Sequence, residues 1–181
     1  MARYEVRLAG FGGQGIILSG YILGKAAALY DGKDAVFSQS YGPEARGGAC
    51  AAEVVIDDDA VDYPVLAHPN ILVLMSQEAA IKYSADMADD AVVLIDEDLV
   101  TAGTASQGRK VFGAPTTRIA EDMGRRLVAN IAMLGFLTGV TSVVGRPAME
   151  EAIRTTVPPK TIDLNLRAFG AGFDHGQRAV S

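Results

Sequence analysis

The sequence is poor in the residues that hold metals or form disulfides, with one cysteine, two histidines and no tryptophan among 181 residues. The single thiol, Cys50, excludes an internal disulfide. With only His68 and His175 beside it, there is no Cys/His spacing typical of a zinc or iron–sulfur site. We therefore expect this chain to hold no metal and to bind no cofactor alone.

Positive charge and long apolar runs are scarce as well. The formal net charge is −6 and the basic residues are scattered, so no basic stripe is available to bind a nucleic acid. The longest apolar stretches, residues 16–30 and 127–140, are interrupted by Ser19, Lys25 and Asn130 and fall short of the roughly 18 apolar residues that a membrane span needs. They predict buried helices, and neither nucleic acid nor membrane is an expected partner.

The length predicts a single domain over residues 1–181, large enough to bury a substantial core. The first residues carry charge and lead into a strand pattern, which differs from the long apolar segment of a secretory signal. We therefore expect a cytoplasmic protein.

Short apolar runs alternate with helical segments along most of the chain. The runs at 71–75 and 91–95 lack polar alternation, which is typical of strands covered on both faces of a mainly parallel sheet. A helical stretch at 77–87 separates them, as in a crossover unit. Further strands are predicted at 5–9, 35–38, 49–56 and 110–113, and further helices at 16–30, 126–140, 148–155 and 161–173. Thr116 or Thr117 is suited to cap a helix that runs to about Met123. The pattern predicts an α/β fold, a three-layer, doubly wound, Rossmann-like arrangement with a helical C-terminal part.

The most informative local motif is a glycine loop after the first strand. Residues 10–15 read Gly-Phe-Gly-Gly-Gln-Gly and lead directly into the first helix. Such a loop lets the backbone approach an anion, with helix N–H groups pointing toward it. Gly12, Gly13, Gln14 and Gly15 are therefore candidate binding residues. A tight strand-to-helix turn with no ligand is an equally good interpretation.

A dinucleotide cofactor would normally require an acidic residue at the end of the second strand, to hold the ribose 2′-OH. That end is Gln39-Ser40, and Asp34 stands at the wrong end of its strand. The nicotinamide-binding pattern is therefore incomplete.

A second polar loop lies at residues 40–48, Ser-Tyr-Gly-Pro-Glu-Ala-Arg-Gly-Gly. Glu44 and Arg46 are candidate contacts to an anionic ligand or to another subunit, because arginine offers a planar fork for carboxylate or phosphate. A salt bridge between the two that only holds the loop in place is the alternative. Asn130, on an apolar helix, is expected to bond to neighbouring backbone rather than to lie across a subunit boundary.

Together the glycine loop and the 40–48 segment resemble the gamma subunit of the 2-oxoacid:ferredoxin oxidoreductase family, whose members act on pyruvate, ketoisovalerate, 2-oxoglutarate or aryl oxoacids. The similarity continues through the 92–96 strand, the 130–135 helix segment and Pro159-Lys160. The resemblance implies a multisubunit enzyme that decarboxylates a 2-oxoacid on thiamine diphosphate and passes electrons through iron–sulfur clusters. The acyl group goes to coenzyme A.

The resemblance also implies where the cofactors reside. This chain lacks a Gly-Asp-Gly motif with a downstream asparagine, which would bind thiamine diphosphate through Mg²⁺, and it lacks cluster cysteines. Thiamine diphosphate, Mg²⁺ and [4Fe-4S] clusters are therefore expected on alpha and beta subunits, with ferredoxin-like and flavin subunits as further possible partners. The resemblance implies ferredoxin or NAD as the electron acceptor. The role left for this chain is to shape the active-site and coenzyme A region and to hold the complex together.

Two other functions remain open from the residues alone: a free-standing dinucleotide-dependent dehydrogenase and a nucleotide-binding regulatory module. The first needs the missing strand-end acid, and the second leaves the 40–48 segment unexplained. Among substrates, 2-oxoglutarate is weakly favoured.

Overall fold

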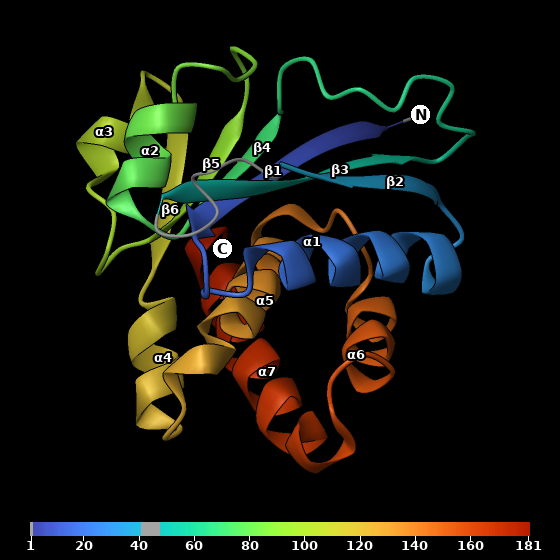
Figure 1. Cartoon of the computed structure of the whole chain (residues 1–181), viewed down its shortest axis with the longest axis vertical. Helices are drawn as coiled ribbons and strands as arrows, with labels where there is room; N and C mark the ends of the chain where they lie inside the picture. The colour runs from blue at the N-terminus through green and yellow to red at the C-terminus, as the bar shows by residue number, and fades with distance from the viewer. Residues whose placement is uncertain (1, 41–47) are drawn as a thin grey trace.

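The computed structural model describes residues 2–40 and 48–181 of the chain. A six-stranded sheet runs through the centre, in the order β2-β3-β1-β4-β5-β6. Figure 1 shows helices on both faces of this sheet. The strands are β1 (Arg3–Phe11), β2 (Asp34–Gln39), β3 (Ala49–Asp57), β4 (Ile71–Leu74), β5 (Val92–Asp96) and β6 (Lys110–Ala114). The predicted three-layer α/β architecture is confirmed.

The sheet is parallel except for one strand. β1 pairs with β4 in parallel, and β4, β5 and β6 continue in the same direction. β3 lies antiparallel between β1 and β2, with Gly10 of β1 opposite Cys50 of β3. β4 is buried at all four positions, as its continuous apolar run predicts.

The helices cover the two faces unequally. The helices α2 (Gln77–Tyr83) and α3 (Ala102–Ser106) lie on one face (Figure 1). The opposite face carries α1 (Ile16–Lys25), α4 (Thr116–Asp122), α5 (Ala129–Thr141), α6 (Arg146–Arg154) and α7 (Ile162–Ala179). Because β1 connects through α1 to β2 on one side while β4 lies on its other side, the strand order reverses at β1. The fold is therefore doubly wound.

Several predicted helix boundaries are wrong. The first helix is regular only to Lys25, and residues 26–30 form a π-helical turn. The second ends at Tyr83 rather than at residue 87, and the last extends to Ala179. A 3₁₀ turn at residues 126–128 precedes α5, and another at 159–161 precedes α7. The short helix α3 was not predicted.

The predicted threonine cap of α4 is also wrong. Pro115 is the N-cap residue and makes no side-chain cap. The hydroxyls of Thr116 and Thr117 both donate to Asp96 Oδ2, at 2.6 and 2.7 Å, and Thr117 N–H donates to the same oxygen at 2.8 Å. Asp96 is fully buried at the end of β5. A buried carboxylate needs such donors, so tertiary contact takes precedence over the local capping preference.

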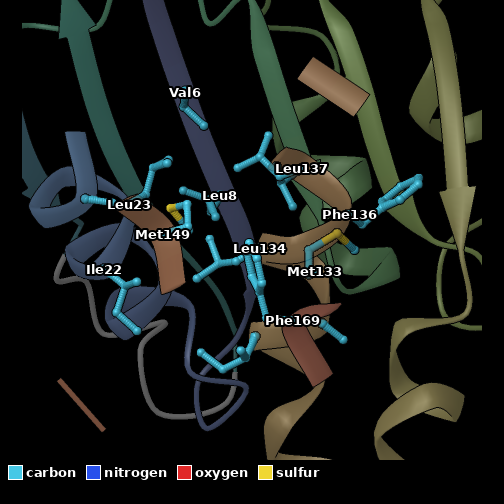
Figure 2. Packing of buried hydrophobic residues seen from close by; sticks show 14 of the residues in the cluster. Val6, Leu8, Ile22, Leu23, Met133, Leu134, Phe136, Leu137, Met149 and Phe169 are labelled. Atoms are coloured by element: carbon cyan, nitrogen blue, oxygen red, sulfur yellow. The ribbon is translucent and has the colours of Figure 1, made fainter. Parts of the chain in front are cut away.

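The larger core lies between the sheet and the helices α1, α5, α6 and α7. Figure 2 shows Leu8 of β1, Leu23 of α1 and Leu134 of α5 among its members. α5 is buried along residues 129–139, so it is enclosed rather than amphipathic. Its predicted apolar character is thereby explained, but Leu127, which precedes it, is 58% exposed instead of joining the core.

α5 and α7 touch through their backbones. A side-chain carbon on Gly135 would overlap the carbonyl oxygen of Phe169, and one on Gly172 would overlap that of Ala132. Gly139 and Gly176 repeat the pattern further along the pair. Glycine is required at these positions because no side chain fits between the two helices.

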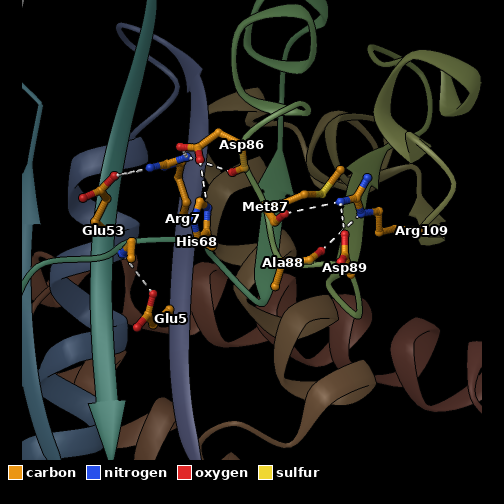
Figure 3. A network of polar contacts seen from close by, with 10 residues as sticks. Glu5, Arg7, Glu53, His68, Asp86, Met87, Ala88, Asp89 and Arg109 are labelled. Carbon is orange, nitrogen blue, oxygen red and sulfur yellow. Dashed lines mark hydrogen bonds and ion pairs between the residues drawn. The ribbon is translucent and has the colours of Figure 1, made fainter.

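The α2 face carries a polar network around a buried arginine (Figure 3). Arg7 of β1 is 7% exposed and binds Glu53 at 2.9 Å and Asp86 at 3.0 Å. Its guanidinium also lies over the Tyr83 ring, 5.3 Å from the centroid. The hydrogen bond from Arg7 lowers the pKa of the Asp86 carboxyl, more than its partial burial raises it. This network fixes the segment after α2 to the sheet.

Candidate functional site

The glycine loop lies at the carboxyl ends of β1 and β4, where the strand order reverses. Ligands of doubly wound folds characteristically bind at this place. Gln14 links the two strand ends: its Oε1 accepts from Phe11 N at 2.6 Å, and its Nε2 donates to Met75 O at 2.8 Å. Both ends of the amide are thus occupied by backbone, so the structure gives Gln14 a role in shaping the loop. A direct ligand contact by Gln14 remains a prediction.

The loop conformation depends on glycine at two positions. Gly13 has φ +94° and Gly15 has φ +76°, in the left-handed region that side chains rarely adopt. Gly12 and Gly13 are exposed, whereas Gly15 is half-buried and forms the N-cap of α1. A side-chain carbon at Gly13 would meet nothing, so the exposed part of the loop leaves backbone open to an incoming group.

The antiparallel strand β3 brings the second motif to the same edge. β2 ends at Gln39 and β3 begins at Ala49, which pairs with Phe11 at the end of β1. The ends of the 40–48 segment are therefore anchored beside the glycine loop. Glu44 and Arg46, the other candidate site residues, lie outside the described residues.

Three hollows surround the glycine loop, and the exposed side chain of Leu127 borders all of them. The loop hollow, about 390 Å³, lies along residues 11–18, with Ser40 and Cys50 on its wall. The strand-end hollow, about 220 Å³, is bordered by Gly13, Gln14, Met75, Thr117, Arg126 and Ala129. The helix hollow, about 180 Å³, lies between the first turns of α1, α5 and α7 and has Arg125 on its rim.

The rim of these hollows carries exposed positive charge. Arg125 and Arg126 follow each other and border different hollows. Arg126 pairs with Glu121 at 3.5 Å, and both side chains are exposed, so that pair is weak. Cys50 is 7% exposed, and its burial raises the pKa of the thiol. It therefore fits a packing residue rather than a nucleophile.

The carboxyl end of β2 is the place where an acidic residue would hold a ribose. The carboxyl end of β2 carries Gln39 and Ser40, and Ser40 N–H donates to Ala51 O at 3.0 Å. Asp34 lies at the opposite end, where its carboxylate accepts from Ala35 N and Val61 N. The described part of the strand end therefore offers no acid for a ribose.

Within residues 2–40 and 48–181 no helix is long and apolar enough to cross a membrane.

Sequence reasoning missed several residues of this edge. Leu127, Arg126 and Thr117 border the hollows, and the buried Asp96 holds Thr117 in place. One signal was available: Asp96 directly follows an apolar run, and the carboxyl ends of parallel strands share an edge. Nothing in the sequence indicates that Leu127 is exposed.

Comparisons with known proteins agree with this geometry. Residues 5–175 match the family model described as pyruvate ferredoxin/flavodoxin oxidoreductase. The chain is 52% identical to the 2-oxoglutarate synthase subunit KorC of Methanocaldococcus jannaschii, over 95% of this chain and 93% of the relative. It is 35% identical to the ketoisovalerate oxidoreductase subunit VorA of Methanothermobacter thermautotrophicus, over 97% of this chain but 37% of VorA.

A solved structure shows the same fold throughout. The gamma subunit of the keto/oxoacid ferredoxin oxidoreductase from Geobacter sulfurreducens superimposes with a TM-score of 0.89 at 44% identity, covering 99% of both chains. The predicted resemblance is confirmed, and it selects the oxidoreductase subunit over the two other functions. The chain therefore belongs to the pyruvate ferredoxin/flavodoxin oxidoreductase family, in which it corresponds over nearly its whole length to the gamma subunit of a 2-oxoacid oxidoreductase.

Proposed function

We propose that this gamma subunit serves a complex that oxidatively decarboxylates 2-oxoglutarate and transfers the acyl group to coenzyme A. The choice of substrate rests on the sequence identities to relatives that differ in substrate. Identity is 52% to a 2-oxoglutarate synthase subunit, against 35% to a ketoisovalerate oxidoreductase subunit. Both relatives align with at least 95% of this chain.

The redox cofactors belong, in this proposal, to partner subunits. A [4Fe-4S] cluster needs four cysteine thiolates, and this chain has only Cys50. The described residues include no group of three or more His, Cys, Asp or Glu side chains that could hold a metal. These residues fit neither a cluster nor a Mg²⁺–thiamine diphosphate site. Alpha and beta subunits are therefore proposed to carry thiamine diphosphate, Mg²⁺ and the clusters.

The part proposed for this chain is to receive coenzyme A at the glycine loop. Coenzyme A is a polyanion, and the loop offers exposed backbone at Gly12 and Gly13 beside the N-terminus of α1. Arg125 and Arg126 add positive charge at the rim. Gln14 and Gly15 shape the loop, and Glu44 and Arg46 remain candidates for contact with coenzyme A or a neighbouring subunit.

We assign the complex to the cytoplasm, treat residues 1–181 as one domain, and take ferredoxin as the acceptor, or NAD where a flavin subunit is present. Ferredoxin-like subunits are further candidate partners. The exposed Leu18 and Leu127, at 41% and 58%, are suited to subunit contact beside the loop.

The test is to purify the native complex through a tagged gamma subunit and to assay a panel of 2-oxoacids for coenzyme A-dependent reduction of a viologen dye. We expect 2-oxoglutarate to give the highest kcat/KM. Thiamine-dependent and iron–sulfur chains should copurify. Preference for another oxoacid would overturn the choice of substrate, and a stable, active gamma monomer would overturn the assembly.

A variant pair tests the role of the 40–48 segment. Arg46→Ala should raise the KM for coenzyme A and leave the complex assembled. The control, Arg178→Ala, removes an exposed arginine from the last turn of α7 and should leave that KM unchanged. Loss of assembly with Arg46→Ala would instead indicate a contact that holds the loop or a subunit in place.

A further inference from the structure

The glycine loop is hydrogen-bonded to an asparagine that lies far away in the sequence. Asn130, near the start of α5, donates from Nδ2 to Gly15 O at 3.2 Å. Its Oδ1 accepts from Ile131 N at 2.9 Å. The side chain is 4% exposed, so this amide is engaged with backbone at both ends. The sequence expectation of an internally bonded amide is confirmed, and its partner is the loop itself.

Gly15 O accepts from two further donors. Ser19 N–H and Ser19 Oγ both donate to it, each at 2.9 Å. Together with Asn130 they fix the direction of the Gly15 carbonyl. A peptide unit is planar and trans, so fixing this carbonyl also fixes the opposite direction of the Ile16 N–H. That N–H is the first of α1, and Ile16 borders the loop hollow.

The same contact explains why residue 15 is glycine. Its φ of +76° disfavours a side chain, and a side-chain carbon there would overlap Asn130 Nδ2. Asn130 itself has a fixed position, because α5 is enclosed between the sheet and α7 along its glycine contacts. Asn130 therefore fixes one end of the loop to α5, and Gln14 fixes the other end to Met75.

We propose that Asn130 is a positioning residue, which orients the Gly15–Ile16 peptide so that the loop is formed before coenzyme A arrives. When the loop is already ordered, no binding free energy of coenzyme A is lost in ordering it. The effect is therefore on the affinity for coenzyme A rather than on the chemical step. This inference rests on the proposed function, because it assigns coenzyme A to the glycine loop.

The test uses Asn130→Asp in the assembled complex. Aspartate keeps the shape and the acceptor oxygen but cannot donate to Gly15 O when ionised. We expect the KM for coenzyme A to rise by about tenfold, a typical consequence of losing one directed hydrogen bond at a binding site. The KM for the 2-oxoacid and kcat should change by less than about twofold, because neither depends on the loop peptide. Coenzyme A titration by calorimetry should show the same loss without turnover.

Asn70→Asp is the matched control. Asn70 also spans two backbone groups, since it accepts from Glu5 N at 2.9 Å and donates to Arg3 O at 3.1 Å. It lies at the other edge of the sheet, beside the beginning of β1. We expect this variant to lose comparable stability and to keep the KM for coenzyme A.

The outcomes separate the two proposals. A wild-type complex without coenzyme A-dependent turnover would overturn the proposed function. If wild type depends on coenzyme A but the two aspartate variants behave alike, or Asn130→Asp lowers only kcat, the positioning role is wrong. Asn130→Ala is measured beside Asn130→Asp, because it removes the same donor to Gly15 O without adding a negative charge and retains helix propensity. An unchanged KM for coenzyme A in that variant would also overturn the role.

Discussion

Gly172 of α7 lies directly against the carbonyl oxygen of Ala132 in α5, with no space for a side-chain carbon between them. Gly172→Ala should therefore destabilise the full chain by about 3 kcal/mol, because the added methyl group must push the two helices apart. The free energy of unfolding, measured by urea denaturation, checks this expectation.

Gly170→Ala is the control in the same helix. A side-chain carbon at that position has only the Arg146 guanidinium near it, at 3.9 Å. Because alanine favours helix over glycine, this variant should gain up to about 1 kcal/mol. Equal losses in the two variants would contradict the backbone contact between α5 and α7.

Replacing the buried Asp96 should lower the stability of the chain more than replacing an exposed acidic residue near it. Asp96→Ala leaves three donors from Thr116 and Thr117 without their acceptor, which should cost about 3 kcal/mol of unfolding free energy. Asp98→Ala, two residues later, removes a partly exposed pair with Arg118 and should cost less than about 1 kcal/mol. Thermal unfolding of both variants would rank the two sites, and a smaller loss for Asp96→Ala would contradict the assignment.

The Arg7 network predicts a specific loss of stability in acid. The pKa of Asp86 is lowered in the folded chain. The pairing with Arg7 therefore stabilises the fold fully above the unfolded pKa of about 4, and this stabilisation is lost as the pH falls through the lower folded pKa. Asp86→Asn should therefore be less stable than wild type at pH 6, by a modest amount because the Asp86 side chain is 51% exposed. The difference should shrink toward pH 2.

Urea unfolding of both proteins between pH 2 and 7 measures this dependence. Asp89→Asn is the control, since Asp89 pairs with Arg109 on the open surface and should change stability by less than about 1 kcal/mol. A gap between Asp86→Asn and wild type that stays constant at every pH would show that ionisation of Asp86 does not stabilise the fold.

Cys50 should react slowly with thiol reagents. It is 7% exposed and its thiol pKa is raised by burial, so little thiolate is accessible. The native chain should react with Ellman's reagent at pH 8 at least about tenfold more slowly than the urea-unfolded chain. Because it is the only cysteine, the absorbance reports this position alone. Equal rates would contradict its burial.

The sequence predicted the fold class and the place of the glycine loop well, because both follow from local patterns. Apolar runs such as β4 mark strands covered on both faces, and the glycines precede the first helix as expected. The break of the first helix at Lys25 was not predictable, since alanines continue the helical pattern.

The long-range geometry of the site could not be read from the sequence. Gly15 and Asn130 were each identified, but their contact depends on how α5 packs beneath the loop. Likewise, β3 runs antiparallel between β1 and β2, and only that arrangement anchors both motifs at one edge. Strand order is a property of the whole sheet, so no local pattern carries it.

The backbone contacts between α5 and α7 also have a consequence for biosynthesis. α5 is apolar on nearly every side, and α7 leaves the ribosome only after the intervening α6. Until α7 emerges, the apolar residues of α5 that pack against it stay uncovered, and they are exposed to chaperones and to aggregation. A translational pause or a truncation ahead of α7 should therefore yield insoluble protein.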